Sequence, residues 1–294
     1  MSAPTRSGFI ALAGRPNVGK STLANAVVGA KVAIVSDKPQ TTRRAIRGVA
    51  NGPGWQLVLV DLPGVQRPRD ALTERMQRRV EHELEDADGC LLVINAEEGV
   101  GPGDRFIAGL LQAARVPVVI AVNKIDRMNR SGTASALQAA ADLDVAEEVF
   151  PVSAATGSGV RPLVDCLVSL LPEGPFYFEP EQRSDQSQQV VLAELVREQV
   201  LARTRQEVPH SVEVVIEGIE HGDPIRIEAV ILAETESQKR ILIGAGGQMV
   251  KSIGIASRRA IERELGSRVH LELKVRVRRH WRADERLLDR LGIE

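Results

Sequence analysis

The sequence has little of several residue types, and each scarcity narrows what the protein can be. It holds two cysteines among 294 residues, Cys90 and Cys166, far apart and each inside an apolar stretch. Such a pair argues against a disulfide scaffold and suits small core residues in a reducing compartment. Aromatic residues make up only 3% of the chain, so its cores must be built from Val, Ile, Leu and Ala.

The chain also lacks an apolar run long enough to span a bilayer, and its first ten residues show no signal-peptide pattern. We therefore expect a cytoplasmic location. Hydrophobic residues make up 43% and charged residues 26%, as in ordinary globular proteins. A chain of 294 residues is too long for one small core, so two domains are expected.

The net charge of −1 hides an asymmetry between the two ends of the chain. From Lys239 onward there are 14 basic and 7 acidic residues, whereas the preceding part has 24 basic and 32 acidic residues. A basic block on an acidic body suggests a polyanion partner for that block, and the competing interpretation is a solvated charged surface.

Short apolar runs recur through the first part of the chain, and helical patterns separate them. The runs have strand length and end in polar or Gly-rich residues: "FIALAG", "WQLVLVDLPG", "CLLVINA", "VPVVIAVNKID" and "EVFPVSA". Buried strands that alternate with helices predict an α/β domain with a mostly parallel sheet and helices on both faces. Ligands of such sheets bind at the carboxyl ends of the strands.

The stretch "LPEGPFYFEPEQRSDQSQQ" interrupts this pattern with three prolines and no apolar periodicity, so it predicts a linker. The chain after it differs in kind, because its pattern is helix, strand, strand, helix, strand. In the last strand Val269, Leu271, Leu273, Val275 and Val277 point to one face, and charged or polar residues point to the other. This order predicts a separate α+β domain.

A phosphate-binding motif lies between the first predicted strand and the following helix. It reads G-x-x-x-x-G-K-S, and with the next residue it comprises Gly14, Arg15, Pro16, Asn17, Val18, Gly19, Lys20, Ser21 and Thr22. Backbone N–H groups, a helix N-terminus and the lysine cradle phosphates in such loops, and the hydroxyl after the lysine binds Mg²⁺. We therefore predict a nucleotide phosphate site.

Three further motifs follow predicted strands and specify the nucleotide. Asp61 can hold Mg²⁺, usually through water, and the N–H of Gly64 can meet the γ-phosphate. Asp126 can accept hydrogen bonds from adjacent N1–H and N2–H₂ donors, which guanine has and adenine lacks. The N–H groups after Ser153 can approach the guanine O6. The segments are Asp61-Leu62-Pro63-Gly64, Asn123-Lys124-Ile125-Asp126 and Ser153-Ala154-Ala155.

A second glycine-rich loop, Gly244-Ala245-Gly246-Gly247, lies in the basic block between an apolar run, expected to be a strand, and a helical pattern. No lysine–hydroxyl pair follows it, so it is not another phosphate loop of the first kind. It fits the G-x-x-G of a KH domain, which clamps about four nucleotides of single-stranded RNA. Lys251, Arg258 and Arg259 follow and can add charge, although the alternative is a simple glycine turn.

Over residues 7–172 these motifs resemble the TrmE-Era-EngA-like P-loop GTPases, and with the second domain they resemble the Era family. The further matches are "QTTR", "AVNK", "SIGIASR", "VHLEL" and "ADERLLDRLG". The resemblance implies a GTPase domain at 1–172, a linker at 173–189 and a type II KH domain with a C-terminal tail at 190–294. It also makes "SDKPQTTRR" the switch I segment, in which Thr42 binds Mg²⁺ and senses the γ-phosphate, with Thr41 as the competing candidate.

Departures from Ras-like GTPases bear on hydrolysis. Val65 follows Gly64 in place of the glutamine that orients water, and Gln66 comes one position late. In relatives with this feature, the asparagine that matches Asn17 binds a K⁺ ion near the phosphates; the alternative is that Asn17 only caps the loop. The candidate catalytic residues are thus Asn17, Lys20, Thr42 and Gly64. Leu62 replaces a usual threonine, and we expect its side chain to face away from phosphate.

The resemblance further implies that the protein binds GTP or GDP with Mg²⁺, hydrolyses GTP slowly and binds the 3′ end of 16S ribosomal RNA. It implies a role in 30S subunit assembly and peripheral association with the inner membrane, and we expect a monomer. Ala245 and Gly246 reduce the charge of the loop and are expected to weaken RNA affinity. Two alternatives stay open: an RNA-binding module that uses GTP only as a conformational ligand, and a GTPase with a protein- or membrane-docking domain.

Overall fold

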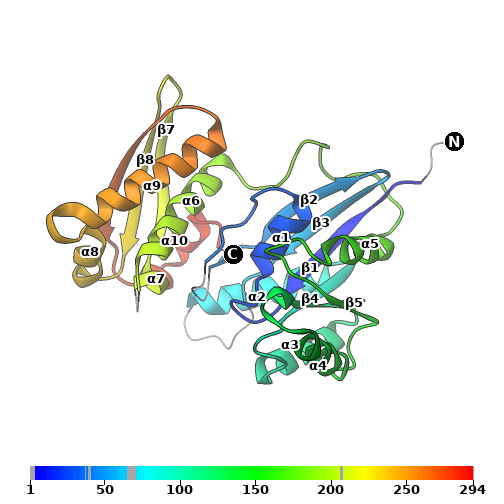
Figure 1. The fold of residues 1–294 in the computed structure, drawn as a ribbon. Coiled ribbons are helices and arrows are strands. Elements are labelled where there is room, and N and C mark those ends of the chain that lie inside the picture. The colour runs from blue at the N-terminus through cyan, green and yellow to red at the C-terminus, as the bar shows by residue number, and fades with distance from the viewer. Residues whose placement is uncertain (1–3, 37, 39–40, 65–70, 206–207, 294) are drawn as a thin grey trace.

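The computed structural model describes residues 4–36, 38, 41–64, 71–205 and 208–293, which form two domains joined by an extended segment (Figure 1). Val65 and Gln66 therefore lie outside the described residues, as do Asp37, Pro39 and Gln40 of the predicted switch I segment.

The first domain is a six-stranded sheet in the order β2-β3-β1-β4-β5-β6. Five strands are parallel: β1 (Arg6–Ala13), β3 (Trp55–Asp61), β4 (Gly89–Asn95), β5 (Val118–Asn123) and β6 (Glu148–Pro151). The edge strand β2 (Ile46–Gly52) runs antiparallel to β3. The sequence pattern missed β2, because its run "IRGVANG" is short and contains two glycines.

Helices cover both faces of this sheet, which confirms the predicted fold class. One core packs α1 (Lys20–Val28) and α5 (Val160–Leu170) against one face. The other packs α2 (Ala71–Glu85), α3 (Pro102–Ala114) and α4 (Arg130–Ala141) against the opposite face. Successive residues of β1 alternate between the two cores, with Ile10 in the first and Ala11 in the second, because side chains of a strand alternate in direction.

The second domain packs helices on one face of a three-stranded sheet. Its sheet order is β7-β8-β9, and β8 pairs antiparallel with β7 and parallel with β9. The strands are β7 (Glu213–Glu220), β8 (Ile225–Ala233) and β9 (Val269–Val277). The helices are α6 (Gln188–Arg203), α7 (Val208–Ser211), α8 (Glu236–Ile243), α9 (Gln248–Leu265) and α10 (Glu285–Arg290). The described residues also form three 3-10 turns: Ile125–Arg127 in the first domain, and Ala245–Gly247 and Trp281–Ala283 in the second.

The segment between the domains lies along strands β2 and β3 of the first domain's sheet. Gln56 on β3 is completely buried, and its side chain accepts hydrogen bonds from the backbone N–H groups of Tyr177 and Phe178, at 2.8 and 2.9 Å. Val49 N–H on β2 donates to Arg183 O at 2.9 Å. Helix α6 begins at Gln188, inside the predicted linker. Among the described residues, no helix combines the length and apolar content needed to cross a bilayer.

Candidate functional site

The loop Gly14–Gly19 connects β1 to α1 and is shaped by its glycines. Gly19 has φ 101°, and a Cβ there would lie 2.4 Å from Asn123 Nδ2, so no other residue fits without a shift. Lys20 Nζ donates to Gly14 O and Arg15 O, at 3.0 and 3.1 Å, which holds the ammonium within the loop. Burial lowers the pKa of Lys20 to about 8, against the raising effect of Asp61. A phosphate anion would satisfy this buried cation.

Three oxygen-bearing side chains converge beside this loop. Ser21 Oγ lies 2.7 Å from Asp61 Oδ2, and Thr42 Oγ1 lies 3.2 Å from the same atom and 3.0 Å from Ser21 Oγ. Burial raises the pKa of Asp61, while Lys20 and the two hydroxyls oppose that rise. Asp61 Oδ1 is buried and has no hydrogen-bond partner among the described residues. A carboxylate with one unpaired oxygen and two hydroxyls beside its other oxygen fit the ligand preference of Mg²⁺.

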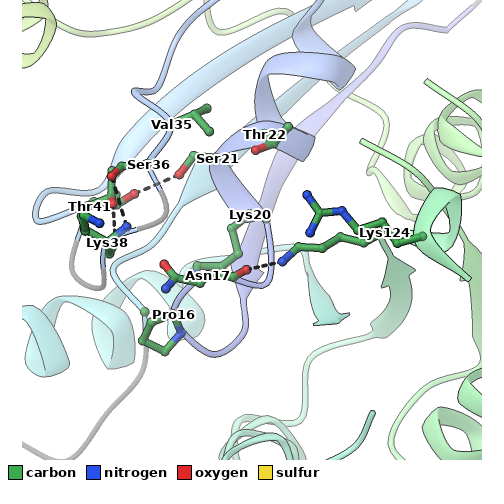
Figure 2. Close-up of a pocket in the computed structure, with 14 residues that line it drawn as sticks. Pro16, Asn17, Lys20, Ser21, Thr22, Val35, Ser36, Lys38, Thr41 and Lys124 are labelled. Carbon is green, nitrogen blue, oxygen red and sulfur yellow. Dashed lines mark hydrogen bonds between the residues drawn. The ribbon is translucent and has the colours of Figure 1, made fainter. Parts of the chain in front are cut away.

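The structure separates the two threonines that competed for the switch I role. Thr42 faces Ser21 and Asp61, as above. Thr41 Oγ1 instead donates to Lys38 O at 2.6 Å, away from the carboxylate (Figure 2). This geometry favours Thr42 over Thr41 as the residue that can reach a metal ion.

Asn123 connects the phosphate loop to the loop after β6. Its side-chain amide donates to Val18 O at 2.9 Å, and its carbonyl oxygen accepts from Ala154 N–H at 3.0 Å. Both bonds are buried. The side chain thus joins the loops that follow β1 and β6, at the carboxyl ends of two strands of the same sheet.

The side chains predicted to meet the base lie next to Asn123. Lys124 Nζ donates to Asn17 O at 2.8 Å and extends across the pocket (Figure 2). Asp126 Oδ1 accepts a hydrogen bond from Ser153 Oγ at 2.6 Å, which leaves its second oxygen available to a ligand. These contacts place an acceptor carboxylate beside an aliphatic lysine stem.

A cavity of about 360 Å³ lies over the phosphate loop and extends to Lys124 and Arg127, while Asn123, Asp126 and Ser153 are not among its lining residues. Its walls come from the phosphate loop, from switch I and from the base side; they include Pro16, Asn17, Gly19, Lys20, Ser21, Thr22, Val35, Thr41, Thr42, Gly64, Lys124 and Arg127. Gly64 packs against the loop, because a Cβ there would lie 3.0 Å from Pro16 Cγ. Leu62 is fully buried in the core and so faces away from the cavity, as expected. Pro63 is also buried, and Ala155 is exposed.

Residues that the sequence analysis did not single out connect switch I to the second domain. Arg43, directly after Thr42, donates to Val212 O at 2.6 Å and to Glu213 Oε2 at 2.8 Å. Its guanidinium lies 5.4 Å from the ring centroid of Trp281. Burial lowers the pKa of Arg43 to about 10, with Glu213 opposing the shift. In the sequence, this contact could be suspected only from the two consecutive arginines of "TTRR" and from Glu213, a charged residue next to the apolar run "VVI".

A network of charges surrounds that contact. Arg44 donates to Glu194 at 2.7 Å and to Leu291 O, and Arg197 donates to Thr41 O. Arg197 also pairs with Glu194 at 2.6 Å. Glu194 and Arg197 of α6 therefore bind residues 41–44 of the predicted switch I segment: Arg197 donates to a backbone oxygen, and Glu194 accepts from an arginine side chain.

The C-terminal tail makes a second junction between the domains. Leu72 and Met76 of α2 pack in one buried cluster with Trp281, Leu288 and Ile293. Figure 1 shows α10 at the junction of the two domains. Helix α2 begins at Ala71, so the tail contacts the first helix that follows Gly64 in the chain.

The second glycine loop corrects one expectation. It follows the helix α8, whereas the apolar run before it was expected to be a strand. A capping box begins α8, because Thr235 accepts from Gln238 N–H at 3.2 Å and Gln238 accepts from Thr235 N–H at 3.1 Å. The pattern "TESQ" before an apolar run was the signal that could have revealed this helix. The resulting order, strand, helix, loop, helix, strand, places the loop between two helices.

Glycine is required at the tip of this loop for backbone reasons. Gly246 and Gly247 have φ values of 58° and 77°, and a Cβ on either would meet nothing within 4 Å. The backbone is thus open to a ligand on this side. Lys251 and Arg258 of α9 line an adjoining groove of about 410 Å³ with His270, Leu271 and Leu273 of β9. Arg259 does not line that groove, because it lies on the other side of α9.

Comparison with known proteins matches both domains. The family described as 50S ribosome-binding GTPase matches residues 9–124, and the family described as KH domain matches residues 207–282. GTPase Era of Mycobacterium tuberculosis (strain ATCC 25618 / H37Rv) is 44% identical, over 97% of this chain and 98% of the relative. GTPase Era of Lactobacillus helveticus (strain DPC 4571) is 42% identical, over 98% of this chain and 96% of the relative.

Two solved structures show the same arrangement of both domains. One is Era in complex with MgGDPNP and nucleotides 1506–1542 of 16S ribosomal RNA, at 35% identity and a TM-score of 0.94, covering 98% of this chain and 99% of that chain. The other is a variant of Aquifex aeolicus Era bound to GDP and AlF₄⁻, at 35% identity and a TM-score of 0.93 with the same coverage. With relatives at this identity over nearly its whole length, the chain belongs to the GTPase Era family, and it joins a P-loop GTPase domain to a KH domain.

Proposed function

We propose that this protein is a GTP-hydrolysing switch whose KH domain binds the 3′ end of 16S ribosomal RNA and which assists 30S subunit assembly. The observation that carries the nucleotide half is the convergence of Ser21 and Thr42 on Asp61 Oδ2, with Asp61 Oδ1 left unpaired, beside the buried ammonium of Lys20. The arrangement suits a Mg²⁺–triphosphate and has no evident structural purpose of its own.

In this proposal each residue of the phosphate side has one task. Lys20 neutralises the β- and γ-phosphates, and the N–H groups of residues 14–22 and of Gly64 orient them. Ser21 and Thr42 would bind Mg²⁺ directly, and Asp61 would bind it directly or through water. When bound, the metal supplies charge neutralisation between the phosphates.

On the base side we assign the choice of guanine to Asp126. Its carboxylate accepts from the N1–H and N2–H₂ donors of guanine, and Ser153 holds one of its oxygens in place. Asn123 supports the two loops, and the stem of Lys124 covers the base. The N–H groups after Ser153, at Ala154 and Ala155, would meet the guanine O6.

Hydrolysis needs a group that orients water, and residue 65 is Val rather than Gln. We propose that a K⁺ ion near the phosphates, held with help from Asn17, supplies the positive charge that an arginine finger supplies elsewhere. Asn17 supports this assignment because it lines the cavity next to Lys20 (Figure 2). Turnover without a partner is then slow.

The RNA half rests on the loop Gly244–Gly247 and on Lys251 and Arg258 in the adjoining groove. Open glycines admit the backbone of a strand, and the cations neutralise its phosphates. We favour small-subunit RNA over the large subunit named in one family description, because the Era structure similar along the whole chain was solved with a 16S fragment.

The test combines two measurements on the full chain. Filter binding with the 1506–1542 RNA, in GTP and in GDP, measures the RNA half, and phosphate release measures turnover. Replacing Gly246 and Gly247 with Asp should abolish RNA binding through strain and repulsion, and it should leave GTP affinity unchanged. RNA binding without turnover in K⁺ would favour the module that uses GTP only as a conformational ligand. Turnover with wild-type RNA affinity in the double variant would favour a docking domain.

We also propose a monomeric cytoplasmic protein that associates peripherally with the inner membrane, a feature supported by the family resemblance alone. Co-sedimentation with vesicles containing anionic phospholipid tests the membrane part. Absence of the protein from the vesicle pellet at low salt would contradict it, and a scattering mass equal to the chain mass of 31.9 kDa would support the monomer.

A further inference from the structure

The basic side chains of the KH domain fall into two groups. Three of those on the strands and the tail are paired with carboxylates: Lys274 with Glu272, Arg276 with Glu217 and Arg278 with Asp284. Arg203 of α6 and Lys251, Arg258 and Arg259 of α9 have no carboxylate partner among the described residues. Unpaired cations on two helices that pack together indicate a surface prepared for an anion that the protein does not supply itself.

These four cations are not all on the RNA groove. Lys251 lies on the crest of α9 and lines the hollows on both sides of it. Arg258 lines the groove beside β9, whereas its neighbour Arg259 lines a separate hollow on the α6 side. Consecutive residues of a helix point about 100° apart, which explains how one helix serves both sides.

The hollow on the α6 side has a volume of about 390 Å³, comparable to the groove's 410 Å³. Arg203, Gln248, Lys251, Ser252 and Arg259 contribute its polar lining. It adjoins another hollow, of about 360 Å³, that Arg203, Gln248 and Ser252 share with Gly244 and Ala245 of the loop. Helix α9 therefore separates two cation-lined surfaces, and the glycine loop borders the one on the α6 side.

Arg203 is held in position for this surface. Its Nε donates to Ser252 Oγ at 3.2 Å, and its Nη1 donates to Gln199 Oε1 at 2.9 Å. These bonds fix the guanidinium between the end of α6 and the start of α9, and they leave Nη2 without a hydrogen bond among the described residues. An arginine fixed in this way suits a phosphate better than a freely moving one, because less side-chain entropy is lost on binding.

We propose that the α6–α9 hollow is a second RNA phosphate site, which binds the backbone after the strand has left the KH groove and crossed the glycine loop. This inference rests on the proposed RNA-binding function and extends its footprint beyond the about four nucleotides that a G-x-x-G loop clamps. Arg203 and Arg259 are its phosphate ligands, and Lys251 serves both sites. Three cations and no carboxylate in the described lining favour an anion, and the bordering glycine loop favours an RNA phosphate over an acidic protein segment.

The experiment compares two RNAs on the full chain with GDPNP and Mg²⁺ bound. One is the 1506–1542 RNA; the other is a single-stranded oligonucleotide of about four nucleotides from its 3′ part. The variant of the second site is Arg203→Gln with Arg259→Gln, and the matched groove variant is Arg258→Gln. Arg259→Gln alone changes only an exposed side chain, so misfolding cannot explain its effect.

We expect the double variant to lose about tenfold or more in affinity for the long RNA and to keep its affinity for the short one within about twofold. The slope of log affinity against log salt for the long RNA should fall by about 1.4, or by about 0.7 for Arg259→Gln alone. Arg258→Gln should weaken both RNAs.

Equal losses for the two RNAs, or wild-type affinity and slope for the long RNA, would overturn this inference and leave the KH function standing. If the wild-type protein binds neither RNA, the proposed function fails, and the second site fails with it.

Discussion

Arg43 Nη1 lies 2.8 Å from Glu213 Oε2 across the boundary between the GTPase domain and the KH domain, and both side chains are buried, with exposures of 1% and 0%. Arg44 and Arg197 also approach Glu213, at 3.7 and 3.9 Å. Thr42 directly precedes Arg43 in the chain, and its hydroxyl lies 3.2 Å from Asp61 Oδ2. Two adjacent residues, Thr42 and Arg43, thus connect the proposed metal ligands to a buried carboxylate of the KH domain.

We expect Glu213→Gln to destabilise the junction strongly. Removing the carboxylate leaves the buried guanidinium of Arg43 without its counter-charge, whereas Arg44 and Arg197 keep Glu194, and breaking a buried pair costs about 3–5 kcal/mol. Urea unfolding followed by Trp281 fluorescence measures the loss, in a Trp55→Phe background because the chain has two tryptophans. The control is Asp223→Asn, which breaks an exposed pair with Arg268 and should leave the transition unchanged. Equal midpoints for both variants would contradict the importance of the buried pair.

The same carboxylate predicts a dependence of stability on pH. Burial alone would raise the pKa of Glu213, but Arg44, Arg43 and Arg197 hold it at about 2, below its ordinary value of 4.5. The stabilisation is therefore complete above pH 4.5 and is lost as the pH falls toward 2; it amounts to at most about 3 kcal/mol. Unfolding free energies measured across this window should fall more steeply for the wild type than for Glu213→Gln. Parallel curves would show that other groups carry the acid sensitivity.

Thr42 and Thr41 should differ in their response to alanine. Thr42→Ala removes a hydroxyl 3.2 Å from Asp61 Oδ2, so we expect it to weaken Mg²⁺-dependent GTP binding by about 1–3 kcal/mol and to lower turnover. Thr41→Ala removes only the bond to Lys38 O, and its effect on Mg²⁺ dependence should be small. Calorimetric titration of GDPNP with and without Mg²⁺ compares them. A larger loss in Thr41→Ala would reverse the assignment.

Asp126→Asn should change the base preference. The amide donates where the carboxylate accepted, so guanine affinity should fall by roughly 1.5–3 kcal/mol and xanthine should bind better. Competition between GTP and XTP measures both changes. Ser153→Ala is the matched control, because it removes the 2.6 Å bond that holds Asp126 and the 3.2 Å bond from Thr156 N–H but keeps the carboxylate, so it should weaken GTP without favouring XTP. Unchanged preference in Asp126→Asn would exclude it as the base-reading residue.

Turnover should depend on K⁺. We expect faster phosphate release in KCl than in NaCl at equal ionic strength, and Asn17→Ala should remove the difference, because the ion replaces a missing positive charge. Gln66→Ala should have little effect if its offset removes it from the attacking water. Equal rates in the two salts, unaffected by Asn17→Ala, would rule out the K⁺ hypothesis.

Much of the nucleotide cavity could be predicted from the sequence, because its motifs are local. Residues 14–22 form a loop whose shape depends on its own glycines and on the helix that follows. The strands that end at Asp61 and Asn123 are buried on both faces, so continuous apolar runs in the sequence predict them. Because parallel strands have their carboxyl ends at the same edge of the sheet, the residues at those ends lie close together. Helix α8 was missed because its apolar run "ILI" is as short as a strand, and only the capping box marks it as helical.

The order of the motifs, the composition of the two halves and the position of the glycine loops were determined by the sequence alone, because each depends on residues that are neighbours along the chain. Tertiary structure decided what those neighbours meet. Arg43 and Glu213 are 170 residues apart, and only the docking of the domains buries them together. Whether Thr41 or Thr42 faces Asp61, and whether Arg258 or Arg259 faces the groove, also depends on that packing. The sequence shows how many basic residues a segment has. The packing of the helix that carries them decides which surface each side chain faces, because its apolar side must be buried against the core.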